Sequence, residues 1–197
     1  MNKIFLIIKT ITIIAFGVFG GYLLYYFVLM DIADVYLDST SNSYFFSSVL
    51  LLILSISSVV FILFMVTGYH VNKKVFYVVL CAYFIVLFFI LFGRPILVRK
   101  FNFNLIASLQ ELTTDSESLL QFILNIIVLM PIAYFFKNKG VIFTELIFLA
   151  ISFGIEIMQY ITARGFFDII DILCYMIGMN LAYLFFKLTK VDIVKRK

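Results

Sequence analysis

Six long apolar runs, separated by short polar segments, organise this sequence. Each run is close to the roughly 20 residues that an α-helix needs to cross the hydrocarbon core of a bilayer. They extend over Ile11–Met30, Tyr44–Tyr69, Val75–Gly93, Ser118–Phe136, Val141–Ile161 and Phe166–Phe186. We therefore predict an all-α integral membrane protein, a multi-pass bundle of about six transmembrane helices.

Composition supports this class and argues against others. Of the 197 residues, 64% are hydrophobic and 13% are charged, which is more apolar than a soluble domain of this size. Cys81 and Cys174 both fall inside apolar runs, and the single histidine, His70, has no cysteine or carboxylate beside it. We therefore expect no metal site, no cofactor and no nucleic-acid partner.

The distribution of Lys and Arg predicts the orientation. If the N-terminus is cytoplasmic, the inside segments hold eleven of the 15 cations. The outside segments hold the other four, which are Arg94, Arg99, Lys100 and Arg164. The first outside loop carries Asp31, Asp34 and Asp38. Because cytoplasmic loops of membrane proteins are enriched in Lys and Arg, we predict that both termini are cytoplasmic.

Polar residues inside the fifth run form a stripe. Ser152, Glu156 and Gln159 stand at i, i+4 and i+7, which places them on one face of a helix. Ionisable side chains are costly in lipid, so they usually face the bundle interior, find partners and mark functional sites. A cation, either Arg164 or Arg94, is the partner we expect for Glu156, and the sequence does not choose between them.

The other intramembrane polar residues fall at the same, outer end of the predicted bundle. Asn125 lies about 10 Å below the outer boundary of its run. Asp168 and Asp171 are one turn apart where the last run begins, and Asp168 suits the positive end of that helix dipole. Together these positions predict an outward-facing polar site.

Three further features predict local structure. Gly17 and Gly21, four residues apart, allow a neighbouring helix to approach closely. Pro131 kinks the fourth run and frees a carbonyl. The long outer loop, residues 94–117, mixes cations with apolar side chains. It is either an interfacial segment or lid over the bundle, or an amphipathic surface segment without a binding role.

These polar residues resemble the signature of a known family. Ser152, Glu156 and Gln159, followed by Arg164, Asp168, Asp171 and Gly178, resemble the C-terminal signature of the VanZ-like family. Two earlier segments also resemble it: Asn104 with Leu105 and Ile106 after Arg94 and Arg99, and Asn125 with Pro131. The sequence departs from the family pattern at Ala107, Ser108, Ala133 and Tyr175.

The resemblance covers about Arg94 to Tyr183 and implies a division of the chain. Residues 1–70 would form two helices without a recognised motif. Residues 71–197 would form a VanZ-like membrane domain of four helices and the outer loop 94–117. The family is named for a membrane protein associated with resistance to teicoplanin, a lipid-tailed glycopeptide antibiotic.

We therefore expect a VanZ-like protein of the bacterial plasma membrane, acting in glycopeptide resistance or a related envelope role. Its partners would be membrane lipid and a lipoglycopeptide or lipid-linked wall precursor. The expected ligand-binding residues are Arg94, Asn104, Asn125, Ser152, Glu156, Gln159, Arg164, Asp168 and Asp171.

Three alternatives remain open from the sequence. One is a membrane-embedded enzyme that acts on a lipid or wall precursor with Glu156, Asp168 and Asp171 as acid–base groups. Catalysis is the less favoured reading, because no histidine or activated serine accompanies these carboxylates. A transporter is disfavoured because polar groups occupy only one half of the bundle. Lastly, ion pairs between these residues could simply fix helix packing.

Overall fold

The computed structural model describes residues 3–36, 42–93, 99–190 and 192. Within that part of the chain, six helices are long and apolar enough to cross a membrane, so the protein is a multi-pass membrane protein. The spans are Ile7–Leu29, Tyr44–Thr67, Lys73–Phe92, Ser118–Phe136, Val141–Thr162 and Ile169–Thr189. The predicted all-α class and six spans are confirmed.

The chain divides into two compact units. The first comprises Met1–Pro95 together with Asp192–Lys197, and the second comprises Ile96–Val191. The first unit contains the helical elements α1 (Lys3–Leu24), η1 (Tyr25–Leu29), α2 (Met30–Tyr36), α3 (Asn42–Thr67) and α4 (Lys73–Phe92). Of these, η1 is a single turn of π-helix that joins α1 to α2.

Small residues hold α1 against α3. A Cβ atom at Gly17 would lie 2.4 Å from Cγ2 of Val60, and one at Gly21 would lie 2.4 Å from Cα of Ile56. Ser55, on α3, also donates a hydrogen bond of 2.9 Å to the carbonyl oxygen of Gly21. The predicted close approach of a second helix is therefore confirmed, since any side chain at either glycine would separate the helices.

The predicted acidic loop after the first span is partly helical. Asp31 and Asp34 lie on α2, and the hydroxyl of Tyr44 donates to the carboxylate of Asp34. This contact joins α2 to the start of α3. Asp38 lies outside the described residues.

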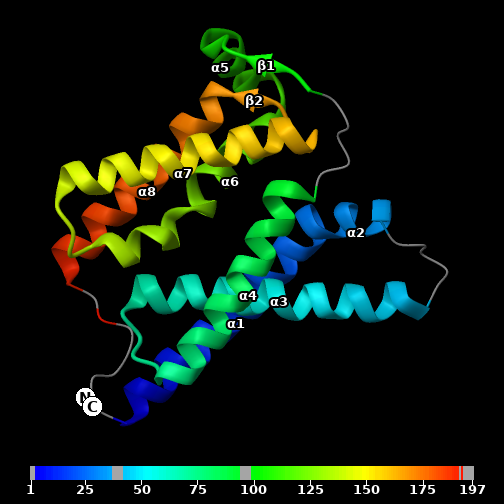
Figure 1. Ribbon diagram of the computed structural model, residues 1–197. Coiled ribbons are helices and arrows are strands. Elements are labelled where there is room, and N and C mark those ends of the chain that lie inside the picture. The colour runs from blue at the N-terminus through cyan, green and yellow to red at the C-terminus, as the bar shows by residue number, and fades with distance from the viewer. Residues whose placement is uncertain (1–2, 37–41, 94–98, 191, 193–197) are drawn as a thin grey trace. The chain divides into compact units, whose positions relative to one another are not determined.

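The second unit carries the candidate site. Its helical elements are α5 (Leu105–Thr114), α6 (Ser116–Val128), η2 (Met130–Phe136), α7 (Val141–Thr162) and α8 (Ile169–Thr189). Two short strands, β1 (Phe101–Asn102) and β2 (Phe167–Asp168), pair in parallel. Helix α8 packs against α6, η2 and α7. Figure 1 shows α5, β1 and β2 gathered at one end of these helices.

Two local expectations are refined by this unit. The chain changes from α-helix to 3₁₀-helix after Val128, with Pro131 near the start of η2, as expected where proline removes a backbone donor. The last span begins at Ile169 rather than Phe166, because Phe167 and Asp168 form β2. Asp168 therefore precedes the first turn of α8 instead of lying in it.

Candidate functional site

The polar stripe of α7 faces the inside of its unit. Ser152 and Glu156 are completely buried and Gln159 is 6% exposed. The hydroxyl of Ser152 donates to the carbonyl oxygen of Phe148 at 2.9 Å, within the same helix. The prediction that these residues share a buried face is confirmed.

Glu156 holds the backbone at the junction of β2 and α8. Its Oε2 atom accepts a hydrogen bond of 2.9 Å from the backbone N–H of Asp168. The sequence suggested Arg164 or Arg94 as the partner and did not suggest a backbone amide. Arg94 lies outside the described residues, and a pairing with Arg164 stays a prediction. Glu156 therefore contacts Asp168 through the backbone N–H of that residue.

The β1–β2 pairing brings the outer loop to the start of α8. Phe101 is in register with Phe167 and Asn102 with Asp168, and the Phe167 N–H donates to the Lys100 carbonyl oxygen at 2.9 Å. A ladder of two residues is too short to be stable alone. Side-chain contacts around it supply the remaining support.

Asn102 provides much of that support. Its Nδ2 donates to Oδ2 of Asp168 at 2.8 Å and to the hydroxyl of Ser108 at 3.0 Å. One amide group therefore ties β1 to α8 and to α5. Asn104 contributes separately, because its Oδ1 accepts from the Ala107 N–H at 3.2 Å and caps the start of α5.

The two aspartates at the start of α8 have different contacts. Asp168 is the N-cap residue, and its Oδ1 accepts from the Ile170 N–H at 3.0 Å, which satisfies an amide that the helix leaves unpaired. Asp171 accepts a hydrogen bond of 2.6 Å from Nδ2 of Asn125 on α6. Asn125 is 3% exposed, so this contact joins α6 and α8 beneath the site.

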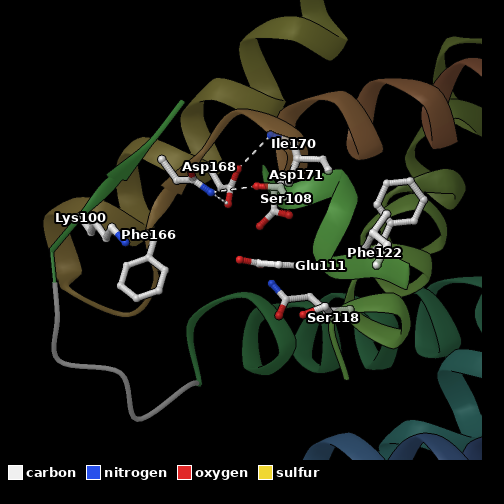
Figure 2. Close-up of a pocket in the computed structure, with 12 residues that line it drawn as sticks. Lys100, Ser108, Glu111, Ser118, Phe122, Phe166, Asp168, Ile170 and Asp171 are labelled. Carbon is white, nitrogen blue, oxygen red and sulfur yellow. Dashed lines mark hydrogen bonds between the residues drawn. The ribbon is translucent and has the colours of Figure 1, made fainter. Parts of the chain in front are cut away.

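A cavity of about 300 Å³ lies between α5, α6 and the start of α8. Figure 2 shows Asp168, Asp171, Ser108 and Glu111 gathered around it, with Lys100 and Phe166 on one side. Its wall is formed by Lys100, Asn102, Ser108, Glu111, Leu112, Ser118, Gln121, Phe122, Phe166, Asp168, Ile170 and Asp171. Three of these side chains are acidic and one is basic, giving the wall a formal charge of −3 + 1 = −2.

Eight of the nine predicted site residues fall into three groups with respect to this cavity, and the ninth, Arg94, lies outside the described residues. Asp168 and Asp171 line it. Glu156, Asn125 and Asn104 do not line it but contact or cap elements that do. Ser152, Gln159 and Arg164 are not part of its wall. Gln159 instead packs beside Gly165, where a Cβ atom would lie 3.3 Å from its side chain.

Several cavity residues were missed in the sequence. Asn102 and Glu111 line the cavity but lie in the outer loop, where polar residues are ordinary and carry no signal. Gln121 also lines the cavity, and it lies in the first turns of the fourth span. One signal was available: Ser108 and Glu111 are three residues apart, followed by Leu112, and such spacing puts them on one face of a helix.

The described residues of the cavity wall supply several kinds of chemical group. Among the residues that the structure describes, no group of three or more His, Cys, Asp or Glu side chains is placed to hold a metal ion. The polar groups of the cavity wall are carboxylates, amides, hydroxyls and one amine. These groups recognise ligands that bear amines, amides or hydroxyls.

Comparison with known proteins identifies one family. The VanZ/LLP1 family model matches residues 74–190, more than half of the chain. No curated protein and no solved structure shows a significant match to the sequence. The matched region includes α5, both strands and all the residues of the cavity wall.

Proposed function

Because this chain belongs to the VanZ/LLP1 family, we propose that it is a bacterial plasma-membrane protein that binds an envelope ligand in the cavity beside α8. The ligand would be the polar part of a lipid-tailed glycopeptide or of a lipid-linked wall precursor. In the first case the protein would contribute to teicoplanin resistance, as its resemblance to the VanZ-like family implies.

The polar cavity carries the proposal. Its charge of −3 + 1 = −2 favours amine-bearing groups over phosphates. Asp168 accepts hydrogen bonds from Asn102 and Ile170, and a carboxylate accepts about four such bonds in all. Asp168 therefore keeps acceptor capacity for a ligand while its own position is fixed.

The size of the cavity sets what it can hold. A volume of about 300 Å³ is at the lower limit for small-molecule sites, which run to about 1,000 Å³. A sugar, an amino acid or a headgroup fits such a volume, and a whole glycopeptide does not. We propose that the cavity holds one polar group while the remainder of the ligand stays in the membrane or in solvent.

Growth inhibition by teicoplanin and vancomycin in a susceptible Gram-positive host tests this proposal. The wild type is compared with Glu111→Gln, with membrane levels checked by immunoblot. Glu111 is exposed at the cavity, so the substitution removes a charge without disturbing the fold. A contact with a charged group contributes about 1.5–3 kcal/mol, which is about ten- to hundredfold in affinity. We therefore expect most protection against teicoplanin to be lost.

The matched control is Glu145→Gln. Glu145 lies on α7, accepts a hydrogen bond from Asn180 at 3.1 Å, and is not in the cavity wall. The Glu145→Gln variant should protect the host against teicoplanin as well as the wild type does. Equal protection by Glu111→Gln and wild type would contradict the cavity as the binding site, and failure of a well-expressed wild type to protect would refute teicoplanin resistance.

A catalytic alternative is favoured by one observation, the presence of Asp168 and Asp171 in the same cavity wall. Acid–base catalysis predicts a product, so membrane lipids from cells with wild type and with Asp171→Asn should differ by chromatography. Binding alone predicts identical lipid profiles and a graded loss of protection. The substituted residue can still accept the hydrogen bond from Asn125, so the packing of α6 and α8 is retained.

A further inference from the structure

An exposed aromatic surface lies beside the cavity. Phe101 and Phe103 are 50% and 64% exposed, and their rings stack with centroids 5.8 Å apart. Phe101 also contacts the ring of Tyr160, with centroids 4.3 Å apart. Both phenylalanines contact Phe167 in β2, at 5.5 Å and 5.8 Å. The outer loop thus presents two large apolar rings held in place by others.

These rings continue the apolar surface of a membrane span. On α7, Phe153, Ile157 and Ile161 are 41%, 46% and 57% exposed, and α7 is long and apolar enough to cross a membrane, so this surface is suited to contact lipid. Phe153 contacts Phe167 at 6.1 Å, and Tyr160 lies in the last turn of the same span. The aromatic rings therefore extend the lipid-facing surface beyond the end of α7.

Helix α5 has two unlike faces. Ser108, Glu111 and Leu112 line the cavity, whereas Ile106 and Leu109 are 70% and 45% exposed. Ile106 and Glu111 are five residues apart, which separates them by about 140° around the helix axis. The cavity side of α5 thus carries Ser108 and Glu111, whereas Ile106 and Leu109 are presented outward.

We propose that residues 101–109 lie in the headgroup region of the bilayer, so that α5 separates lipid from the cavity and the cavity is reached from the membrane surface. The occupant of the apolar face is phospholipid. A helix with one apolar and one polar face lies in the plane of such an interface. Lys100 supports this assignment: it is exposed beside Phe101, and lysine side chains at a membrane interface lay their apolar stem along apolar surface and keep the charged end in the polar layer. The proposal does not depend on the ligand of the cavity.

The sequence offers a direct test because it contains no tryptophan. A single introduced tryptophan is then the only tryptophan of this 197-residue sequence. Phe103→Trp and Ile106→Trp report on the proposed lipid face, Ile157→Trp on a span, and Glu111→Trp on the cavity face of the same helix. Each variant is reconstituted into phosphatidylcholine–phosphatidylglycerol vesicles, with or without bromine atoms on the acyl chains.

We expect brominated lipid to remove a large fraction of the emission from Phe103→Trp, Ile106→Trp and Ile157→Trp. Glu111→Trp should lose little emission to brominated lipid and more to aqueous iodide. Phe103 and Ile106 are both exposed, so either variant tests the proposal if the other fails to give a monodisperse, helical protein.

Two results would overturn the proposal. Quenching of Phe103→Trp and Ile106→Trp by iodide but not by brominated lipid would place this face in water. Quenching by neither would mean that protein, such as a second copy of the chain, covers it. Since no ligand is added, these results are independent of teicoplanin protection, and either proposal can fail alone.

Discussion

At the scale of single residues, Glu156 shows how a carboxylate is accommodated within a membrane helix. It is completely buried, which is costly for a charged group unless hydrogen bonds offset the lost hydration. The Asp168 N–H donates a hydrogen bond of 2.9 Å to the Oε2 atom of Glu156. Glu156 is therefore a positioning residue, because it fixes the main chain of a residue that lines the cavity.

Gly178 is the residue at which a single methyl group should matter most. A Cβ atom there would lie 1.7 Å from the carbonyl oxygen of Ile126, so Gly178→Ala must push α8 away from α6. Overpacking of this kind costs about 1–3 kcal/mol, more than the gain of about 1 kcal/mol in helix propensity. We expect Gly178→Ala to have a lower midpoint of thermal unfolding than the wild type, measured by circular dichroism in detergent.

Gly154→Ala is the matched control for that experiment. Gly154 also lies within a helix, but a Cβ atom there would meet nothing within 4 Å. The control should unfold at the wild-type temperature or slightly above it. Equal midpoints for the two variants would show that α6 and α8 are not in the close contact described here.

The residues predicted from the sequence and those missed differ in how far along the chain the signal or contact that identifies them extends. Ser152, Glu156 and Gln159 were placed correctly on a buried face because helical periodicity is a local signal. Asn102 was missed because its contact with Asp168 spans 66 positions in sequence. Nothing near Asn102 in the sequence indicates that partner.

At the scale of elements, the spans were predictable and the strands were not. A bilayer requires long apolar helices, so six runs identify six spans, with ends displaced by a few residues. The β1–β2 ladder has only two residues in each strand, too few to show an alternating pattern. Both the β2 segment and the late start of α8 at Ile169 depend on this non-local pairing.

The position of α5 should depend on Asn102. Asn102→Asp replaces the amide that donates to Asp168 and Ser108 with a carboxylate, which repels Asp168 and leaves a hydrogen bond unmade. We expect faster hydrogen–deuterium exchange of the backbone amides of residues 105–114, measured by mass spectrometry on purified protein.

Asn180→Asp provides the matched control, because Asn180 donates to the carboxylate of Glu145 at 3.1 Å, and so this variant also sets two carboxylates against each other. Asn180 and Glu145 are not in the cavity wall. Exchange in α5 should be unchanged in this variant. If both variants accelerate exchange in α5 equally, Asn102 is not a specific link between α5 and α8.

At the scale of the whole molecule, the charge distribution relates the cavity to one side of the membrane. Eleven of the 15 Lys and Arg residues fall in segments predicted to be cytoplasmic. The turn before α7 belongs to that set, with Lys137 and Lys139. Strand β1, which precedes α5, pairs with β2, which follows α7, so the cavity lies at the end of α7 opposite to that turn. The positive-inside rule then predicts a cavity that opens outside the cell.

Cysteines introduced at the cavity and in the turn before α7 test this orientation in whole cells. In a Cys81→Ser background, we compare Glu111→Cys at the cavity with Gly140→Cys, whose Cβ atom would meet nothing within 4 Å. The remaining Cys174 is completely buried, and the background protein without an added cysteine measures any labelling of it. A membrane-impermeant maleimide should label Glu111→Cys in intact cells and Gly140→Cys only after permeabilisation. The reverse pattern would mean that the cavity opens toward the cytoplasm. A glycopeptide acting from outside the cell could not reach it there. This measurement therefore decides whether the proposed ligand has access to the cavity.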